Sequence, residues 1–189
     1  MTPTPDPFST RGFGASAPWL DLVNSELWDG FGNFTECLDD PRWVRSFLRY
    51  WNLRIAPGNA KGLKALRELR VLLRQLIETS SARGTLSEEE LAELNSWLKV
   101  PVYPALVESQ SRFALSLQPA QVGWQSEVAK IARSFADSLL HEAKGHLKIC
   151  ANQDCRWIFV DRTKGNVRRW CHDATCGNRD RVRRARRRG

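Results

Sequence analysis

Four cysteines near the C-terminus are the residues whose type and spacing point most directly to chemistry. Cys150 and Cys155 form one pair, Cys171 and Cys176 form a second pair with the same spacing, and fifteen residues separate the two pairs. Two thiolates from each of two chain segments supply the four ligands of tetrahedral zinc with little loop entropy to lose. We therefore predict one bound Zn²⁺. Four thiolates leave no open coordination position, so the site is expected to be structural.

Two alternatives stay open for this cluster. In the first, the cysteines are small buried hydrophobic residues and no metal is bound. In the second, His172 replaces one of the thiols as a ligand. Disulfides are disfavoured because the chain begins without a secretory signal and has no apolar run of the roughly 18 residues that a membrane span needs. We expect a soluble cytoplasmic protein, whose thiols are kept reduced.

Positive charge is concentrated in the same region as the cysteines. Residues 150–189 carry twelve Lys and Arg against four Asp, whereas residues 1–149 carry 17 basic and 17 acidic residues. The whole net charge of +8 therefore lies in the last forty residues. This asymmetry favours nucleic acid as the partner of the tail.

The most basic segment, residues 177–188, contains seven arginines and one aspartate, and we expect it to form a helix after Cys176 with Asp173 as its N-cap. Arginine, unlike lysine, forks onto phosphate and onto guanine O6 and N7. For Arg169 and Arg179, neutralising the doubly negative zinc centre is an equally open role. A disordered solubilising tail is the other alternative. The candidate nucleic-acid contacts are Arg168, Arg169, Arg179, Arg181, Arg183, Arg184, Arg186, Arg187 and Arg188.

The remainder of the chain predicts an α+β fold. We expect a disordered arm over residues 1–17, a mostly helical domain with a small antiparallel sheet over 18–146, and a small four-cysteine finger ending in the basic helix over 147–189. Helical spacing and capping residues predict helices that follow Asp40, span about 59–82, follow Ser87 and span 124–144. Alternating apolar residues predict a strand over 19–24, a hairpin over 102–117 with its turn near 109–111, and a small hairpin between the cysteine pairs that contains residues 157–160.

The finger resembles the bacterial CGNR zinc finger. The residues that carry this resemblance are Phe159-Val160-Asp161, Arg168-Arg169-Trp170-Cys171 and Cys176-Gly177-Asn178-Arg179. The preceding domain resembles the ABATE-type domain through Leu20-Asp21-Leu22-Val23-Asn24, Leu69-Arg70 and Leu94-Asn95, although Ser25 stands where that motif usually has threonine. The resemblance implies a stress-induced transcription regulator, in which the finger binds DNA and the first domain senses a small molecule.

Two other classes of function compete with a DNA-binding regulator. An RNA- or ribosome-associated zinc protein is the alternative, because arginine-rich segments also order on folded RNA. An enzyme is disfavoured, because no glycine-rich phosphate loop, nucleophile elbow or metal-ligand pair precedes Cys150. Polar residues inside apolar elements are the candidate effector contacts, namely Asn24, Arg70 and Asn95. We expect duplex DNA as the partner, and the sequence leaves the oligomeric state open.

Overall fold

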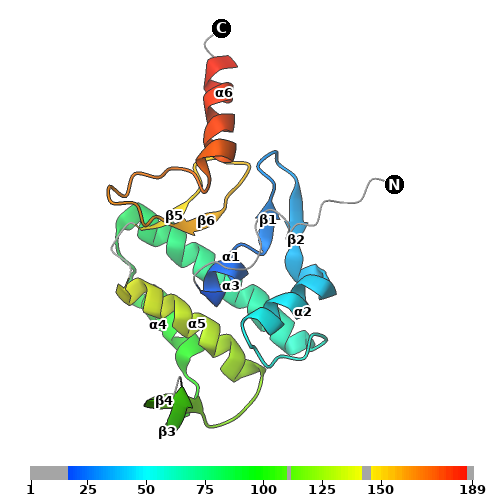
Figure 1. Ribbon diagram of the computed structural model, residues 1–189, viewed down its shortest axis with the longest axis vertical. Helices are drawn as coiled ribbons and strands as arrows, with labels where there is room; N and C mark the ends of the chain where they lie inside the picture. The colour runs from blue at the N-terminus through cyan, green and yellow to red at the C-terminus, as the bar shows by residue number, and fades with distance from the viewer. Residues whose placement is uncertain (1–16, 110–111, 142–145, 187–189) are drawn as a thin grey trace.

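A computed structural model describes residues 17–109, 112–141 and 146–186 of the 189-residue chain. Within these residues a mostly helical body combines with three two-stranded antiparallel sheets, and a last helix stands out at one end (Figure 1). The expected α+β fold is therefore confirmed. No helix in this described part is both long and apolar enough to cross a membrane.

The elements follow one another along the chain without repeats. The body contains α1 (Pro18–Val23), β1 (Glu26–Trp28), β2 (Phe34–Glu36), the short 3₁₀ helix η1 (Cys37–Asp39), α2 (Pro41–Tyr50), α3 (Ala60–Arg83), α4 (Glu88–Leu98), β3 (Val102–Ser109), β4 (Arg112–Pro119) and α5 (Trp124–His141). The C-terminal part contains β5 (Leu147–Ile149), β6 (Ile158–Val160), the π-helical turn η2 (Asp173–Gly177) and α6 (Asn178–Arg186).

Capping residues mark the ends of three helices of the body. The carboxylate of Asp40 accepts a hydrogen bond from the first turn of α2, and the Asn59 side chain does the same for α3. Gly84 ends α3 in the left-handed conformation with φ of 74°. Ser87 and Glu90 form both bonds of a capping box at the start of α4. The helix starts predicted after Asp40 and Ser87, the span predicted for α3 and the hairpin of β3 and β4 are confirmed, while part of the hairpin turn and the end predicted for α5 lie outside the described residues.

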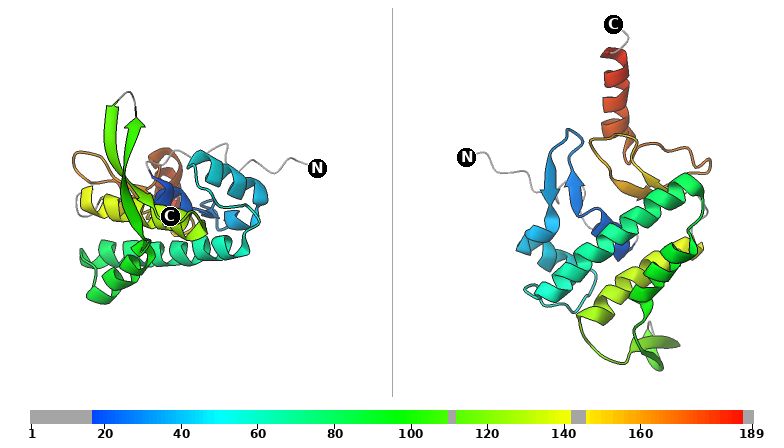
Figure 2. Two further views of the ribbon diagram at one scale, coloured as in Figure 1. Left: turned by 90° about the horizontal axis from the view of Figure 1, so that it is seen from below. Right: turned by 180° about the vertical axis from the view of Figure 1, so that it is seen from behind.

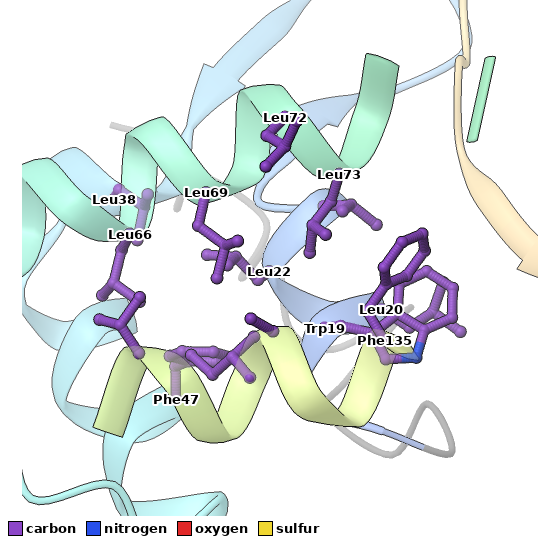
Figure 3. Packing of buried hydrophobic residues seen from close by; sticks show 14 of the residues in the cluster. Trp19, Leu20, Leu22, Leu38, Phe47, Leu66, Leu69, Leu72, Leu73 and Phe135 are labelled. Atoms are coloured by element: carbon purple, nitrogen blue, oxygen red, sulfur yellow. The ribbon is translucent and has the colours of Figure 1, made fainter. Parts of the chain in front are cut away.

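Helix α3 is the central element of the body, and the core forms where its apolar stripe meets α1, α2 and α5 (Figure 3). Leu69 of α3 and Leu22 of α1 are fully buried there. The Trp19 ring packs edge-on against Phe135 of α5 at 5.2 Å between centroids, and its indole N–H donates to Ser138 Oγ at 2.8 Å. A large aromatic side chain is thus buried with its polar atom satisfied.

The strand predicted over residues 19–24 is wrong, because these residues form α1. Pro18 occupies the first helical position, where its missing N–H is not needed. Residues 19–23 are all buried, so the short helix is enclosed on every side. In a segment this short, with only Asp21 interrupting the apolar residues 19–23, the pattern does not distinguish a strand from a buried helix.

Strand β6 of the finger lies close to the residues predicted for it, but the strand that pairs with it is not in the predicted place. It pairs with β5, which precedes Cys150, in the register Leu147↔Val160 and Ile149↔Ile158. The hairpin therefore encloses the first cysteine pair and does not lie between the two pairs. Leu147 and Ile158 also belong to the main core, so the apolar core continues from the body into the C-terminal part.

Two side chains of the body bond directly to the backbone of the loop between β5 and β6, which holds Cys150 and Cys155 and which we call the first cysteine loop, or to Ile158 directly after it. The Asn24 amide donates to the Ile158 carbonyl at 2.9 Å and accepts from the Ile158 N–H at 2.8 Å, and both bonds are buried. Arg74 of α3 donates to the Val23 carbonyl at 2.7 Å and to the Arg156 carbonyl at 3.2 Å. Asn24 thus acts like one residue of an additional strand, because it satisfies both backbone groups of Ile158.

This arrangement predicts that Asn24→Ala lowers the free energy of unfolding by about 2 kcal/mol, since it leaves the Ile158 N–H and carbonyl buried without partners. Asn95→Ala is the matched control, because Asn95 is exposed on α4. It should change stability by less than about 0.5 kcal/mol. Urea denaturation of both variants measures the difference, and equal values would contradict a structural role for Asn24.

Candidate zinc centre and arginine helix

The four cysteines of the finger converge on one point. Their Sγ atoms all lie within 4.8 Å of one another. Cys155 Sγ and Cys171 Sγ are 3.6 Å apart, and Cys171 Sγ and Cys176 Sγ are 3.8 Å apart. The first pair lies in the loop between β5 and β6, whereas Cys176 lies in η2 at the base of α6. Cys171 is half-buried, and the other three are buried.

The donor set fits one zinc ion. Metal–sulfur bonds of about 2.3 Å in a tetrahedron require sulfur–sulfur separations of about 3.8 Å, close to those observed. All five cysteines of the chain are free thiols. His172 lies exposed outside the cluster, which does not favour it as a ligand. The four-cysteine cluster is therefore consistent with one structural zinc.

Electrostatics within the cluster disfavour four thiolates in the absence of a cation. Contact with Cys155 raises the pKa of the Cys150 thiol to about 11, and contacts with Cys150 and Cys155 raise the pKa of Cys171. Four thiolates at such short separations repel one another unless a positive ion lies between them. A zinc ion would supply that charge, and N–H groups of the chain donate hydrogen bonds to the sulfurs.

The surroundings of the sulfurs hold the two cysteine loops in place. The Cys171 N–H donates to Cys150 Sγ at 3.5 Å, and the Asn152 amide donates to Cys176 Sγ at 3.8 Å. Trp170 packs against the cluster. A Cβ atom on Gly177 would lie 3.3 Å from the Trp170 ring and would displace the Asp173 carboxylate, so the glycine lets η2 pack closely against Trp170.

Buried Asp161 organises the loop that leads to Cys171. Its carboxylate accepts from Lys148 Nζ at 2.8 Å, from Thr163 Oγ1 at 2.6 Å and from the Arg168 N–H at 2.8 Å. Burial alone raises the pKa of Asp161, but these hydrogen bonds outweigh it and hold the pKa well below the usual range. The carboxylate is therefore charged at neutral pH and fixes both ends of the loop.

Arg168 and Arg169, two of the candidate nucleic-acid contacts, lie close to the cysteines. Arg168 stacks on the Phe159 ring at 4.7 Å and donates to the Cys171 carbonyl. Arg169 is exposed and lies over the Trp170 ring at 5.2 Å. Arg168 therefore has structural partners on the finger. The Arg169 guanidinium is instead exposed to solvent and contacts one face of the Trp170 ring.

The arginine of the C-G-N-R sequence, Arg179, points into the body and not along α6. Its guanidinium lies 3.8 Å from the centroid of the Phe31 ring and donates to the Asp29 carbonyl at 3.0 Å. Both partners belong to the turn between β1 and β2. The Gly30 N–H in that turn donates to the Asp154 carbonyl of the first cysteine loop at 3.0 Å. The turn therefore contacts the zinc loop and α6 together.

The other described arginines of α6 differ in their partners. Arg183, one turn beyond Arg179, donates to Asp154 Oδ2 at 2.8 Å and to Asn152 Oδ1 at 3.2 Å. Arg181 pairs with Asp173 at 3.2 Å, so Asp173 does not cap α6 with its side chain as predicted, since it lies within η2. Arg184 pairs with Asp180, and Arg186 has no hydrogen-bond partner among the described residues. Arg187 and Arg188 lie outside the described residues.

The three candidate effector residues differ in their partners and in their exposure. Asn24 bonds to Ile158, as described above, and Asn95 is exposed on α4. Arg70 is buried and donates to both carboxylate oxygens of Glu36 at 2.6 Å and to Ser25 Oγ at 2.9 Å. Asn24 and Arg70 therefore have bonding partners within the fold, whereas Asn95 faces solvent, and effector binding by the three residues stays a prediction.

Sequence reasoning missed the residues of the body that hold the finger. Gly30 and Phe31 of the β1–β2 turn carried no motif, and neither did Asn152, their partner in the finger; the two glycines of the turn are the one sequence signal that points to it. Gly30 and Gly32 both have positive φ, of 84° and 97°. Only the first approaches another segment: a Cβ atom on Gly30 would collide with the Arg179 guanidinium, whereas one on Gly32 would meet nothing within 4 Å.

The zinc assignment predicts how the thiols react with an alkylating reagent. In the metal-loaded protein at pH 8 none of the five should react, because four are bound to zinc and Cys37 is buried with its pKa raised to about 12 by burial. A chelator should release one zinc per chain and expose four thiols, while Cys37 reacts only after unfolding. Mass spectrometry with metal analysis measures both numbers. Free reaction of four thiols without a chelator would contradict the zinc site.

The two turn glycines give a matched test of the Arg179 contact. Gly30→Ala and Gly32→Ala carry a similar strain from positive φ, but only the first displaces Arg179. We expect Gly30→Ala to lower the free energy of unfolding by about 1–2 kcal/mol more than Gly32→Ala, because it also removes the cation–π contact and a hydrogen bond. Urea denaturation compares the two, and equal losses would show that the Arg179 contact does not stabilise the fold.

Two family models match this chain. Residues 16–142 match the ABATE model, which is described as a "Putative stress-induced transcription regulator". Residues 146–189 match the model of the CGNR zinc finger. Neither is described as an enzyme family, and no curated protein sequence matches the chain. Since the first model covers more than half of the chain and the second covers the cysteine cluster, the chain belongs to the ABATE family and carries a CGNR zinc finger behind its ABATE domain.

Proposed function

We propose that this protein is a transcription regulator that binds duplex DNA through α6 and has no enzymatic activity of its own. The observation that carries the proposal is the position of α6, which stands out from the zinc centre at one end of the molecule and has no buried residue (Figure 1). A helix without an apolar face is not held by packing, and arginine is the side chain best suited to phosphate.

The arginines of α6 divide into two groups in this proposal. Arg179 and Arg183 lie one turn apart, and both bond to the body or to the first cysteine loop, so we assign them to anchoring the helix. Arg181 and Arg184 are about half exposed and pair only with Asp173 and Asp180. Surface ion pairs of this kind contribute little, and a DNA phosphate competes with such a carboxylate.

The candidate DNA contacts are therefore Arg181, Arg184 and Arg186, together with Arg187 and Arg188. Arg169 is a further candidate because it is exposed next to the zinc centre, where its guanidinium lies over the Trp170 ring. A guanidinium held over a ring on a rigid metal site is well placed to contact a base edge, where one bidentate contact contributes about 1–3 kcal/mol of discrimination.

The proposal further includes that the ABATE domain senses a small-molecule effector. Asn24 and Arg74 connect the body to the first cysteine loop, and the β1–β2 turn connects it to α6. A ligand that shifted α3 or this turn would change the position of α6 without contacting it. The bonds at this junction thus give an effector a route to the DNA-binding helix.

The salt dependence of binding tests the proposal. If about five arginines contact phosphate, the logarithm of the affinity for duplex DNA should fall with the logarithm of salt concentration at a slope of about −4 to −5. The double variant Arg181→Ala/Arg184→Ala should make that slope shallower by about 2, since each lost contact removes about 0.9. Fluorescence anisotropy of a labelled duplex between about 50 and 200 mM salt measures the slope.

Arg45→Ala is the matched control, because Arg45 is an exposed arginine on α2 of the body. It should leave the slope unchanged, and all variants should retain one zinc. An unchanged slope in the double variant would contradict the assignment of α6. Structured RNA as a competitor separates the alternative, since displacement of DNA by equal or lower concentrations of RNA would favour an RNA-binding protein.

A further inference from the structure

The hairpin of β3 and β4 is the least covered element of the body. It lies at the opposite end of the molecule from α6 and projects away from the helices (Figures 1 and 2). None of the side chains described in its two strands is buried, and none belongs to the core. An isolated two-stranded hairpin is only marginally stable in water, so this element needs a partner for its apolar residues.

The register of the hairpin gathers these apolar residues on one face. Alternate residues of paired strands share a face, and Leu106 is opposite Leu115 while Glu108 is opposite Phe113. Leu106, Phe113 and Leu115 are 68%, 76% and 78% exposed. The complete face consists of Val102, Pro104, Leu106, Glu108, Phe113, Leu115, Leu117 and Pro119, which we call the hairpin face.

The opposite side of the same two strands has a different composition. It carries Tyr103, Ala105, Val107, Arg112, Ala114, Ser116 and Gln118, and all of these except Tyr103 and Val107 are small or polar. The hairpin is thus amphipathic although it has no core beneath it. Since a solvated hairpin has no need of five large apolar side chains on one side, the pattern indicates an interface.

We propose that the hairpin face is a homodimer interface, covered by the hairpin face of a second copy of this chain. Phe contributes up to about 200 Å² and each aliphatic side chain roughly 100 Å², so one copy offers on the order of 600 Å². Two copies bury about 1,200 Å², above the roughly 1,000 Å² that a specific interface needs. The area is therefore sufficient for a self-complementary pair.

The charge pattern fits a two-fold arrangement. Glu108 is the one charged residue of the hairpin face and lies near its tip, whereas Lys99 is exposed where the chain enters the base of the hairpin. In an antiparallel two-fold pair, the tip of each hairpin lies at the base of the other. Glu108 of one copy then approaches Lys99 of the other. The apolar residues around Leu106 and Leu115 contact the same residues of the second copy.

The oligomeric state of the full chain tests this proposal. Sedimentation velocity of the zinc-loaded protein over a range of micromolar concentrations should show a reversible dimer. Leu115→Glu should raise the dissociation constant about 100-fold, because a two-fold interface contains the substitution twice and each copy loses about a factor of ten. Leu106→Glu, on the other strand of the same face, should have the same effect.

Ala114→Glu is the matched control, since it adds the same charge to the neighbouring residue on the opposite side of β4. It should leave the dissociation constant within about threefold of the original. Zinc content and the thermal transition of each variant establish that it is folded. A wild-type chain that stays monomeric throughout, or equal dissociation by Ala114→Glu and Leu115→Glu, would overturn the proposal and leave the hairpin face to a different partner or to none.

Discussion

The repulsion among four closely spaced thiolates is the constraint on which the C-terminal part of this protein depends. The sulfurs lie within 4.8 Å of one another, a separation that suits metal ligands and opposes free thiolates. Closing this cluster fixes Cys176 at the base of α6 and the first cysteine loop against the body. The position of the base of α6 therefore depends on the cysteine cluster, since α6 has no buried side chain of its own.

The junction between body and finger adds a second set of constraints. Ile158 is part of the main core and also bonds to Asn24, so the first cysteine loop is held by apolar packing and hydrogen bonds together. Arg179 ties α6 to the β1–β2 turn. Because these contacts come from α1, α3 and the turn, the orientation of α6 depends on the body as well as on the zinc centre.

Local patterns predicted much of this architecture because their causes are local. Capping residues and apolar spacing located α2 to α5, and the alternation in residues 102–117 predicted the hairpin of β3 and β4. The prediction failed for α1, whose apolar residues face packing partners on every side. It also failed for the partner of β6, because strand pairing depends on which segments meet in space.

The sequence by itself determined that four thiols have a spacing that suits one metal site and that all the excess positive charge lies in the same last forty residues, because ligand type, spacing and charge are properties of the residues. Only the tertiary structure decided which arginines are committed to the fold. Arg179 and Arg183 belong to the same basic run as Arg181 and Arg184, yet the first two bond to the body and the first cysteine loop. The physical reason is that a guanidinium binds whichever ring, carbonyl or carboxylate the fold brings within reach, and those partners lie 29 to 150 residues away along the chain.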